Sequence, residues 1–293
     1  MNASVHHPII DTHQHLWDMK QFSPPWLHDA AESKINRPSN MADYIRETKG
    51  LNVVATLYME VDVDPRQHIE EANWVSDVCR SGKTPMVGGV VSARPDDPGC
   101  ARYIRRYRND PYILGFRQVL QVPDALPGLC LQQQFVKNIQ LCGEFGKTFD
   151  FCIRSSELQD ALTLAKLCPD TRFILDHCGN GSARNPNQAQ WEMDIAAIAK
   201  QKNVVCKISG IVKTVKPEWD ITRELFHVVR HVYKCFGPNR IMFGGDWPVC
   251  NKTKSFKAWV TALDAIFADL SDGDLRKFYH DNAVAFYGLS SRS

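Results

Sequence analysis

An alternation of two kinds of segment constrains the fold of this chain more than any other feature. Short apolar runs rich in β-branched residues are followed by longer stretches with helical periodicity. Strands that are apolar along their whole length are typical of parallel sheets buried on both faces. The predicted strands are the start of residues 9–18 and then residues 51–60, 86–92, 113–120, 148–153, 171–177, 204–209 and 240–245.

The segments between these runs have the length and spacing of amphipathic helices. Ser155 is predicted to cap the helix that ends at Leu167. The other predicted helices are residues 65–81, 98–108, 131–144, 187–200, 218–236, 256–270 and 273–278. Eight β/α units suffice to close a TIM barrel. An open doubly wound sheet is the alternative, but no G-x-G-x-x-G follows the first strand. We therefore predict an α/β fold, a single-domain (β/α)8 TIM barrel over residues 1–293.

Composition excludes several classes of function. The net charge is only +2, and no run of lysine or arginine exceeds two residues, so binding to nucleic acid has no electrostatic support. No apolar stretch approaches the roughly 18 residues that a membrane span requires. With 44% hydrophobic residues in 293, the chain can bury a large core. The expected partner is therefore a small molecule, with no nucleic acid and no membrane.

Ten cysteines are many for a chain of this length. No two lie closer than ten residues, as in Cys142 and Cys152, and most stand inside apolar segments. Such cysteines are typical of small buried hydrophobes in a reducing compartment and not of a disulfide framework. We accordingly expect a cytoplasmic protein.

The first predicted strand contains two histidines, His13 and His15. Residues two apart in a strand project to the same face, so both imidazoles point the same way. Two imidazoles at the end of a buried strand are poor core material. They suit the binding of a metal ion or the stabilisation of a developing negative charge.

Polar side chains stand at the carboxyl end of nearly every predicted strand, where a TIM barrel has its active-site face. In chain order they are Glu60 with Asp62 and Asp64, Ser92 and Arg94, Arg117 and Gln118, Arg154, Asp176 and His177, Lys207 and Ser209, and Asp246. Arg117 lies inside an apolar run, where an unpaired guanidinium is costly. Purely structural roles stay open: Arg94 and Arg154, like Glu60, also fit rim charges, and Lys207 also fits a snorkelling side chain.

The tryptophans divide into two groups. Trp17 and Trp247 adjoin the polar strand ends and are predicted to wall the pocket. Packing roles are expected for Trp26, Trp74, Trp191 and Trp259. Trp26 also belongs to the loops after the first two strands, whose mixture of aromatic and acidic residues suits stacking on a sugar and accepting hydrogen bonds from its hydroxyls.

Three motifs together resemble the amidohydrolase superfamily. They are D-T-H-Q-H-L-W-D at residues 11–18, L-D-H-C-G at 175–179 and G-G-D-W-P at 244–248, in this order and at barrel-unit spacing. The sequence is most similar to the amidohydrolase-2 branch, which holds sugar lactonases (L-fuconolactonase and L-rhamnonolactonase) and 2-pyrone-4,6-dicarboxylate lactonase. The resemblance continues to N-A-V-A-F-Y-G-L at 282–289.

The resemblance implies catalytic roles for His13, His15, His177 and Asp246, with Asp246 as general base toward water. Superfamily members with two metal ions carry a lysine on strand four and a histidine on strand five. Here strand four has Arg117, and strand five, F-D-F-C-I-R, has no histidine. The resemblance therefore implies at most one divalent ion, zinc, held by the same four residues and not required for turnover.

The function implied is a hydrolase that opens a lactone ring, with a sugar (aldono-) lactone favoured. Substrate-binding roles are predicted for Glu60, Arg94, Arg117, Arg154, Lys207, Trp17 and Trp247. A dicarboxylate lactone of the 2-pyrone-4,6-dicarboxylate type is a second candidate substrate, since several of these side chains are cationic. A zinc-dependent decarboxylase of the same superfamily and a barrel that has lost catalysis are rival interpretations.

Overall fold

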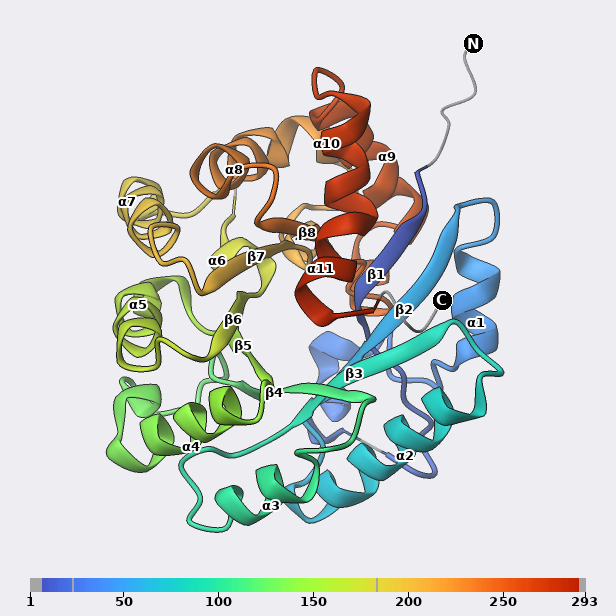
Figure 1. The fold of residues 1–293 in the computed structure, drawn as a ribbon. Coiled ribbons are helices and arrows are strands. Elements are labelled where there is room, and N and C mark those ends of the chain that lie inside the picture. The colour runs from blue at the N-terminus through green and yellow to red at the C-terminus, as the bar shows by residue number, and fades with distance from the viewer. Residues whose placement is uncertain (1–6, 23, 183, 290–293) are drawn as a thin grey trace.

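The computed structural model describes residues 7–22, 24–182 and 184–289. Its eight parallel strands form one sheet in the order β1 to β8, curled into a barrel (Figure 1). The strands are β1 (Ile9–Gln14), β2 (Val53–Met59), β3 (Met86–Ser92), β4 (Ile113–Val119), β5 (Thr148–Cys152), β6 (Arg172–Leu175), β7 (Val204–Ile208) and β8 (Ile241–Phe243). The barrel closes between β1 and β8, where Gln14 pairs with Trp247. The predicted TIM barrel is confirmed.

Helices surround the sheet (Figure 1). They are α1 (Met41–Glu47), α2 (His68–Ser81), α3 (Cys100–Arg106), α4 (Gln133–Glu144), α5 (Leu158–Leu167), α6 (His177–Asn180), α7 (Gln188–Ile198), α8 (Ile221–Phe236), α9 (Phe256–Ile266), α10 (Asp272–Arg276) and α11 (Asn282–Tyr287).

Two local expectations need correction. Helix α1 was not among the predicted elements, although Asn40 and Asp43 form a capping box at its start. Ser155 does not cap a helix: it opens the 3-10 turn Ser155–Glu157, and α5 begins only at Leu158 without a side-chain cap. The side chain of Arg154, the residue before the turn, donates a hydrogen bond to Glu157, the last residue of the turn.

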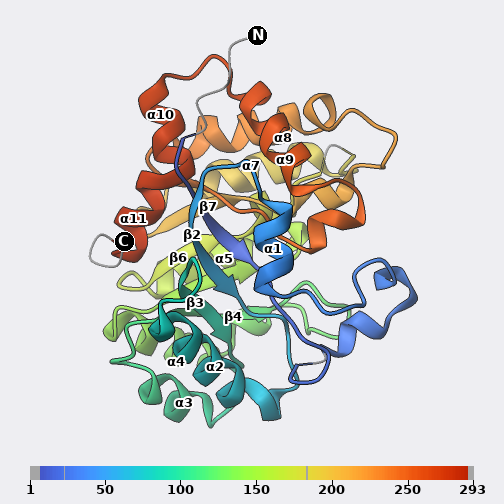
Figure 2. The ribbon, with the colours of Figure 1, turned by 90° about the vertical axis from the view of Figure 1, so that its right-hand side faces the viewer.

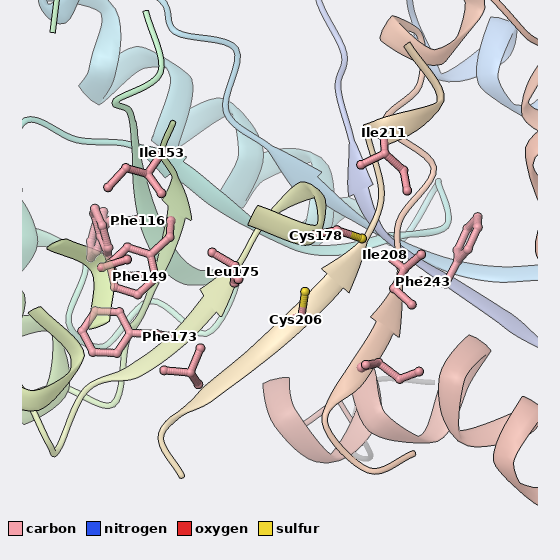
Figure 3. Close-up of a cluster of buried hydrophobic side chains, with 14 of the residues drawn as sticks. Phe116, Phe149, Ile153, Phe173, Leu175, Cys178, Cys206, Ile208, Ile211 and Phe243 are labelled. Carbon is pink, nitrogen blue, oxygen red and sulfur yellow. The ribbon is translucent and has the colours of Figure 1, made fainter. Parts of the chain in front are cut away.

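Alternation along the strands sorts side chains between two cores. Outward-facing residues such as Phe149, Phe173 and Cys206 belong to the larger core cluster, and Figure 3 shows them on their strands. Phe151 and Phe173 are stacked with ring centroids 4.7 Å apart. Inward-facing residues fill the barrel. In the half near the amino ends of the strands these residues are apolar: Ile10, Leu57, Met59, Val90, Leu114, Ile174, Val205 and Met242.

The two halves of the barrel interior differ in chemistry. Tyr287 of α11 and Leu289 pack against the apolar half and close the barrel at the amino ends of the strands. Two residues further along β6 and β7, the inward positions are Asp176 and Lys207, both buried. The interior thus changes from hydrocarbon to ion pairs toward the carboxyl ends of the strands.

The long connection from β1 to α1 projects beyond those carboxyl ends (Figure 2). It contains the 3-10 helices η1 (Pro25–His28) and η2 (Ala30–Glu32). The Trp26 indole donates to the carbonyl of Val61 at 2.8 Å, and Lys34 Nζ donates to the carbonyl of Lys252 at 2.9 Å. The connection therefore covers part of the face where the polar strand ends lie.

All ten cysteines are free thiols, nine of them buried, which confirms their prediction as small hydrophobes. Within the described ranges, the helices are too short or too polar for any to cross a bilayer.

Candidate active site

The seam between β1 and β8 brings His13, His15 and Asp246 together. The amide of Asp246 donates to the carbonyl of His13 at 2.8 Å, and the amide of His15 donates to the carbonyl of Trp247 at 2.8 Å. Asp246 Oδ1 consequently lies 3.2 Å from His15 Nε2 and 3.6 Å from His13 Nε2. All three side chains are buried.

Two glycines allow Asp246 to reach this position. A Cβ on Gly245 would stand 2.1 Å from the Phe256 ring, and one on Gly244 would stand 2.8 Å from the Cβ of His13. Asp246 itself has a φ of 54°, in the left-handed region. Asp11 fixes the turn, since its Oδ1 accepts from the amides of Gly245 at 2.7 Å and His13 at 3.0 Å.

His177 enters the site from the end of β6 on a similarly unusual backbone, with a φ of 55°. Its Nδ1 shares a hydrogen bond of 2.9 Å with Ser209 Oγ. Its ring lies 4.6 Å from that of His13, centroid to centroid. Gly210 packs against His177 so closely that a Cβ there would lie 2.1 Å from Nδ1.

Buried ion pairs lie next to the histidines, inside the barrel. Arg117 donates to Glu60 Oε1 at 2.6 Å and to Asp176 Oδ2 at 3.1 Å. Lys207 Nζ lies 2.6 Å from Asp150 Oδ2 and 3.4 Å from Asp176 Oδ1. Asp176 therefore joins both cations, and its Oδ1 also lies 3.5 Å from His13 Nδ1.

These contacts set the proton positions on the first two histidines. Since a carbonyl can only accept, the 3.0 Å contact with Met59 O places a proton on His15 Nδ1. On His13, the guanidinium of Arg117 donates to Nε2 at 3.3 Å, which leaves the proton on Nδ1, facing Asp176.

Burial and neighbouring groups together set the charges of His13, His177 and Asp246. Burial lowers the pKa of His13 well below the usual value and that of His177 to about 4, against the attraction of nearby carboxylates. Burial alone would raise the pKa of Asp246, but His177 and the hydrogen bond with His15 outweigh it and hold the pKa below its usual range. At neutral pH the site thus presents an ionised carboxylate beside the neutral imidazoles of His13 and His177.

A cavity of about 280 Å³ opens above these groups. It is lined by His15, Trp26, Glu32, Glu60, Val61, Asp62, Arg117, Val119, Gln121, Val122, Cys152, His177, Lys213, Asp246, Val249 and Lys252. The apolar lining residues include Trp26 and four valines, and the polar ones carry charges of both signs.

Of the polar residues predicted at strand ends and in the loops after them, six line this cavity: His15, Glu60, Asp62, Arg117, His177 and Asp246. His13 lies directly beneath them, in contact with Asp246 and Arg117. The structure thus brings the four proposed catalytic residues and two of the proposed substrate-binding residues into one site.

Five predicted substrate-binding residues are absent from the described lining, and each has another use. Arg94 donates to Asp62 at 2.6 Å. Arg154 donates to the carbonyl of Ala125 at 2.9 Å, and Lys207 is sealed below the site.

The two tryptophans predicted to wall the pocket are also buried in packing contacts. Trp17 packs edge-on against Trp26 with centroids 5.6 Å apart, and Trp247 packs edge-on against Tyr44 at 5.5 Å. Position next to a motif is therefore a poor guide to cavity exposure, because both tryptophans lie beyond the ends of their strands, where packing with Trp26 and Tyr44 sets their direction.

Among the charged and aromatic lining residues, four were missed or assigned a different role. Trp26 was expected to serve in packing, and Glu32, Lys213 and Lys252 were not singled out. All four lie in loops or 3-10 turns several residues beyond a strand end. Only the aromatic and acidic character of the loop around Trp26 gave a signal.

The donor set fits a single divalent ion. With Nδ1 turned to Met59 O, His15 Nε2 faces Asp246 Oδ1 at 3.2 Å, a distance at which a proton or a cation lies between the two atoms. Asp246 Oδ2 is also buried without a hydrogen-bond partner.

Two triads have ligand atoms within 4.8 Å of one another, His13–His15–Asp246 and His13–Asp176–His177. Because both use His13, one ion is the natural occupancy. The nearby guanidinium of Arg117 weakens its binding by repulsion.

Comparisons with known proteins find relatives that match nearly the whole chain. The chain is 24% identical to an L-fucono-1,5-lactonase of Burkholderia ambifaria, covering 97% of both chains. It is 26% identical to an L-rhamnono-gamma-lactonase of Scheffersomyces stipitis, covering 96% of this chain and 98% of that one. A zinc-bound amidohydrolase structure from Burkholderia multivorans has a TM-score of 0.84 at 21% identity, covering 96% and 99%. The amidohydrolase family model (Amidohydro_2) matches residues 10–289, so the chain belongs to the amidohydrolase family.

Proposed function

We propose that this amidohydrolase-family enzyme hydrolyses the ring ester of a neutral sugar lactone. The observation that carries the proposal is the ionised Asp246 held among histidines at the floor of a cavity with an indole in its wall. The names of the lactonase relatives, which this chain matches over nearly its full length, support the same reaction class.

In the proposed mechanism, Asp246 accepts a proton from a water molecule as its oxygen attacks the lactone carbonyl carbon. The carbonyl π bond opens, and negative charge develops on the carbonyl oxygen. When the carbonyl re-forms, the bond to the ring oxygen breaks. Asp246 then returns the proton to the departing alkoxide, which gives a hydroxy acid and restores the carboxylate.

The supporting residues act by position. Asp176 and Met59 O hold the rings of His13 and His15, so their orientation is set before substrate binds. Arg117 is held by Glu60 and Asp176, which fixes the wall beside His13. A metal ion held by His13, His15 and Asp246, with His177 beside them, would act as a Lewis acid toward the carbonyl.

The charges of the lining favour a neutral substrate over a dicarboxylate. Four carboxylates, Glu32, Glu60, Asp62 and Asp246, face three cations, Arg117, Lys213 and Lys252. Arg117 is already paired with Glu60, and Lys252 with Glu32 at 2.6 Å. Hydroxyl groups of a sugar suit these acceptors, and its apolar face suits the indole of Trp26.

A lactone screen tests this proposal. Purified protein is offered a panel of aldono-1,4- and 1,5-lactones, with pyrone dicarboxylate as the charged comparison, and acid release is followed. We expect turnover of at least one neutral sugar lactone and little of the dicarboxylate.

The variant Asp246→Asn should lower kcat by about 10³-fold, because an amide cannot accept the proton from water. Its circular dichroism and melting temperature should stay close to those of the wild type. Near-normal turnover by this variant would remove Asp246 from the mechanism, and carbon dioxide release from a carboxylic acid would favour a decarboxylase.

A further inference from the structure

The cavity contains three cations, and they differ in how they are neutralised. Arg117 contacts two carboxylates and Lys252 contacts one. Lys213 makes no side-chain hydrogen bond or ion pair with any residue in the described part of the chain. It is the cation of this lining that no ion pair holds, although its charge acts through space on the Asp246 carboxylate.

The backbone that carries Lys213 is well anchored. Lys213 belongs to the 3-10 helix η6 (Ile211–Thr214), whose residues Ile211 and Val212 are buried. Figure 3 shows Ile211 among the packed side chains at the end of β7. The carbonyl of Val212 accepts from Thr253 Oγ1 at 2.9 Å, which ties η6 to the segment after β8.

The start of η6 is set by the active site itself. Gly210 has a φ of 62° and packs directly on the imidazole of His177. The amide of Ile211 donates to the carbonyl of Ser209 at 2.7 Å, and Ser209 Oγ contacts His177. The position of Lys213 is therefore coupled to that of His177 through three consecutive residues.

The proposed hydrolysis needs a positive charge that the other groups do not offer. His13 Nε2 accepts from Arg117 while its Nδ1 faces Asp176, and His177 Nδ1 is engaged with Ser209 Oγ. Both nitrogens of His15 are engaged, with Met59 O and Asp246. The tetrahedral intermediate places a full negative charge on the former carbonyl oxygen, beside the Asp246 carboxyl.

From this arrangement we infer that Lys213 is a catalytic residue, whose ammonium binds the carbonyl oxygen of the lactone as negative charge develops there. The inference rests on the proposed function. In the ground state the lactone is neutral and gains little from the ammonium. The intermediate and the hydroxy-acid product, which carries a carboxylate, gain much more.

This difference defines the experiment. With the neutral lactone found in the screen, Lys213→Gln should lower kcat about 10²-fold while changing KM by less than about threefold. The inhibition constant of the product aldonate should rise about tenfold or more, because its carboxylate loses the same partner. Lys213→Arg, which keeps the charge, should recover most of the lost kcat.

Lys216→Gln is the matched control. Lys216 lies three residues away and is exposed, with its ammonium 4.8 Å from the ring centroid of Trp219, and it is not in the cavity lining. This variant should keep wild-type kcat, KM and product inhibition. Melting temperatures of all three variants should match the wild type, since none loses an ion pair seen in the structure.

The outcomes separate the two proposals. If the wild type hydrolyses a lactone and Lys213→Gln keeps kcat and product inhibition within about threefold, the assignment of Lys213 is wrong and the proposed function stands. If KM rises with kcat unchanged, Lys213 binds substrate and is not catalytic. If the wild type hydrolyses no lactone, the proposed function fails and the assignment fails with it.

Discussion

The absence of a side chain at Gly210 leaves the space that the imidazole of His177 occupies. An alanine at this position would place its Cβ 2.1 Å from His177 Nδ1 and would also adopt a positive φ. We expect Gly210→Ala to cost about 1–2 kcal/mol of unfolding free energy from backbone strain alone. Displacement of His177 should in addition lower kcat/KM about tenfold or more.

Gly82→Ala separates these two effects. Gly82 has nearly the same φ, 61°, but nothing lies within 4 Å of the added Cβ. It should lose a similar amount of stability in urea denaturation and retain full activity. Equal activities of the two variants would show that His177 tolerates the displacement.

Lys207 neutralises two buried carboxylates, those of Asp150 and Asp176. Lys207→Met removes the partner of Asp150 and a neighbour of Asp176, both fully buried, and should destabilise the protein by about 3–5 kcal/mol at pH 7. Lys202→Met, at an exposed position in the turn just before β7, should stay within about 0.5 kcal/mol of the wild type.

The loss from Lys207→Met should also depend on pH. Burial raises the pKa of Asp150 to about 7 even with Lys207 present, and without Lys207 it must rise further. A carboxyl with a raised folded pKa holds its proton in the folded state while the unfolded chain releases it above about pH 4. Stability therefore falls as pH rises, up to about pH 7 in the wild type and beyond it in the variant, so the gap between the two should widen above about pH 7. A constant gap in urea denaturation would contradict this account.

At the residue scale, the sequence predicts those site residues that end a strand. Asp246 and His177 follow apolar runs and point where the barrel geometry requires. The cavity positions of Lys213 and Trp26 were not predicted, because they depend on how loops fold back over the barrel. The proposed substrate role of Lys207 and Arg154 has no support in the lining, because burial and pairing with a partner cannot be read from the position of a cation in a strand.

At the scale of elements, the connection between β1 and α1 carries the aromatic wall of the cavity. Trp26 contacts the barrel through its indole N–H to Val61 O and through the ring of Trp17. The Glu32–Lys252 pair is partly exposed, so it adds less than about 1 kcal/mol to holding the connection in place.

Substitutions at Trp26 should therefore separate anchoring from stacking. Trp26→Phe keeps an aromatic face and loses the N–H, whereas Trp26→Ala loses both. We expect KM for the sugar lactone to rise about threefold for the first and at least tenfold for the second, with kcat changing less. Steady-state kinetics checks this, and equal KM values for both variants would show that the hydrogen bond matters and the ring does not.

Element boundaries were predicted well where hydrophobic periodicity is strong. Strand β3 matches its prediction at both ends, and α5 ends at Leu167 as expected. Helix α1 was missed because it is only seven residues long and one of its residues, Tyr44, is buried, so it shows almost no periodic signal. Its polar capping box was the sole local evidence.

For the whole molecule, the division of the barrel interior separates stability from chemistry. The apolar half and α11 supply hydrophobic burial, while the ionised half positions the site. The alternation of eight strands with helices was enough to predict the barrel, because a strand of a barrel packs against helices on its outer face only. The paired state of the inner charges was not predictable, since it depends on contacts between strands far apart in sequence.

Metal removal tests how far the site depends on an ion. After dialysis against EDTA we expect lactone hydrolysis to persist, because Asp246 can activate water by itself, while the melting temperature falls. Added zinc should restore the melting temperature in the wild type but not in His15→Ala. Activity that is lost with EDTA and recovered with zinc would instead make the ion essential.

The seam of the barrel runs through the residues proposed for catalysis. The amides that join β1 to β8 at this end are those of His15 and Asp246, whose side chains face the cavity. A molecule that bridges these side chains therefore also clamps the first strand to the last. Binding at the site should consequently be readable in hydrogen exchange, as slower exchange of the His15 and Asp246 amides relative to those in β4 and β5, which are paired on both sides within the sheet.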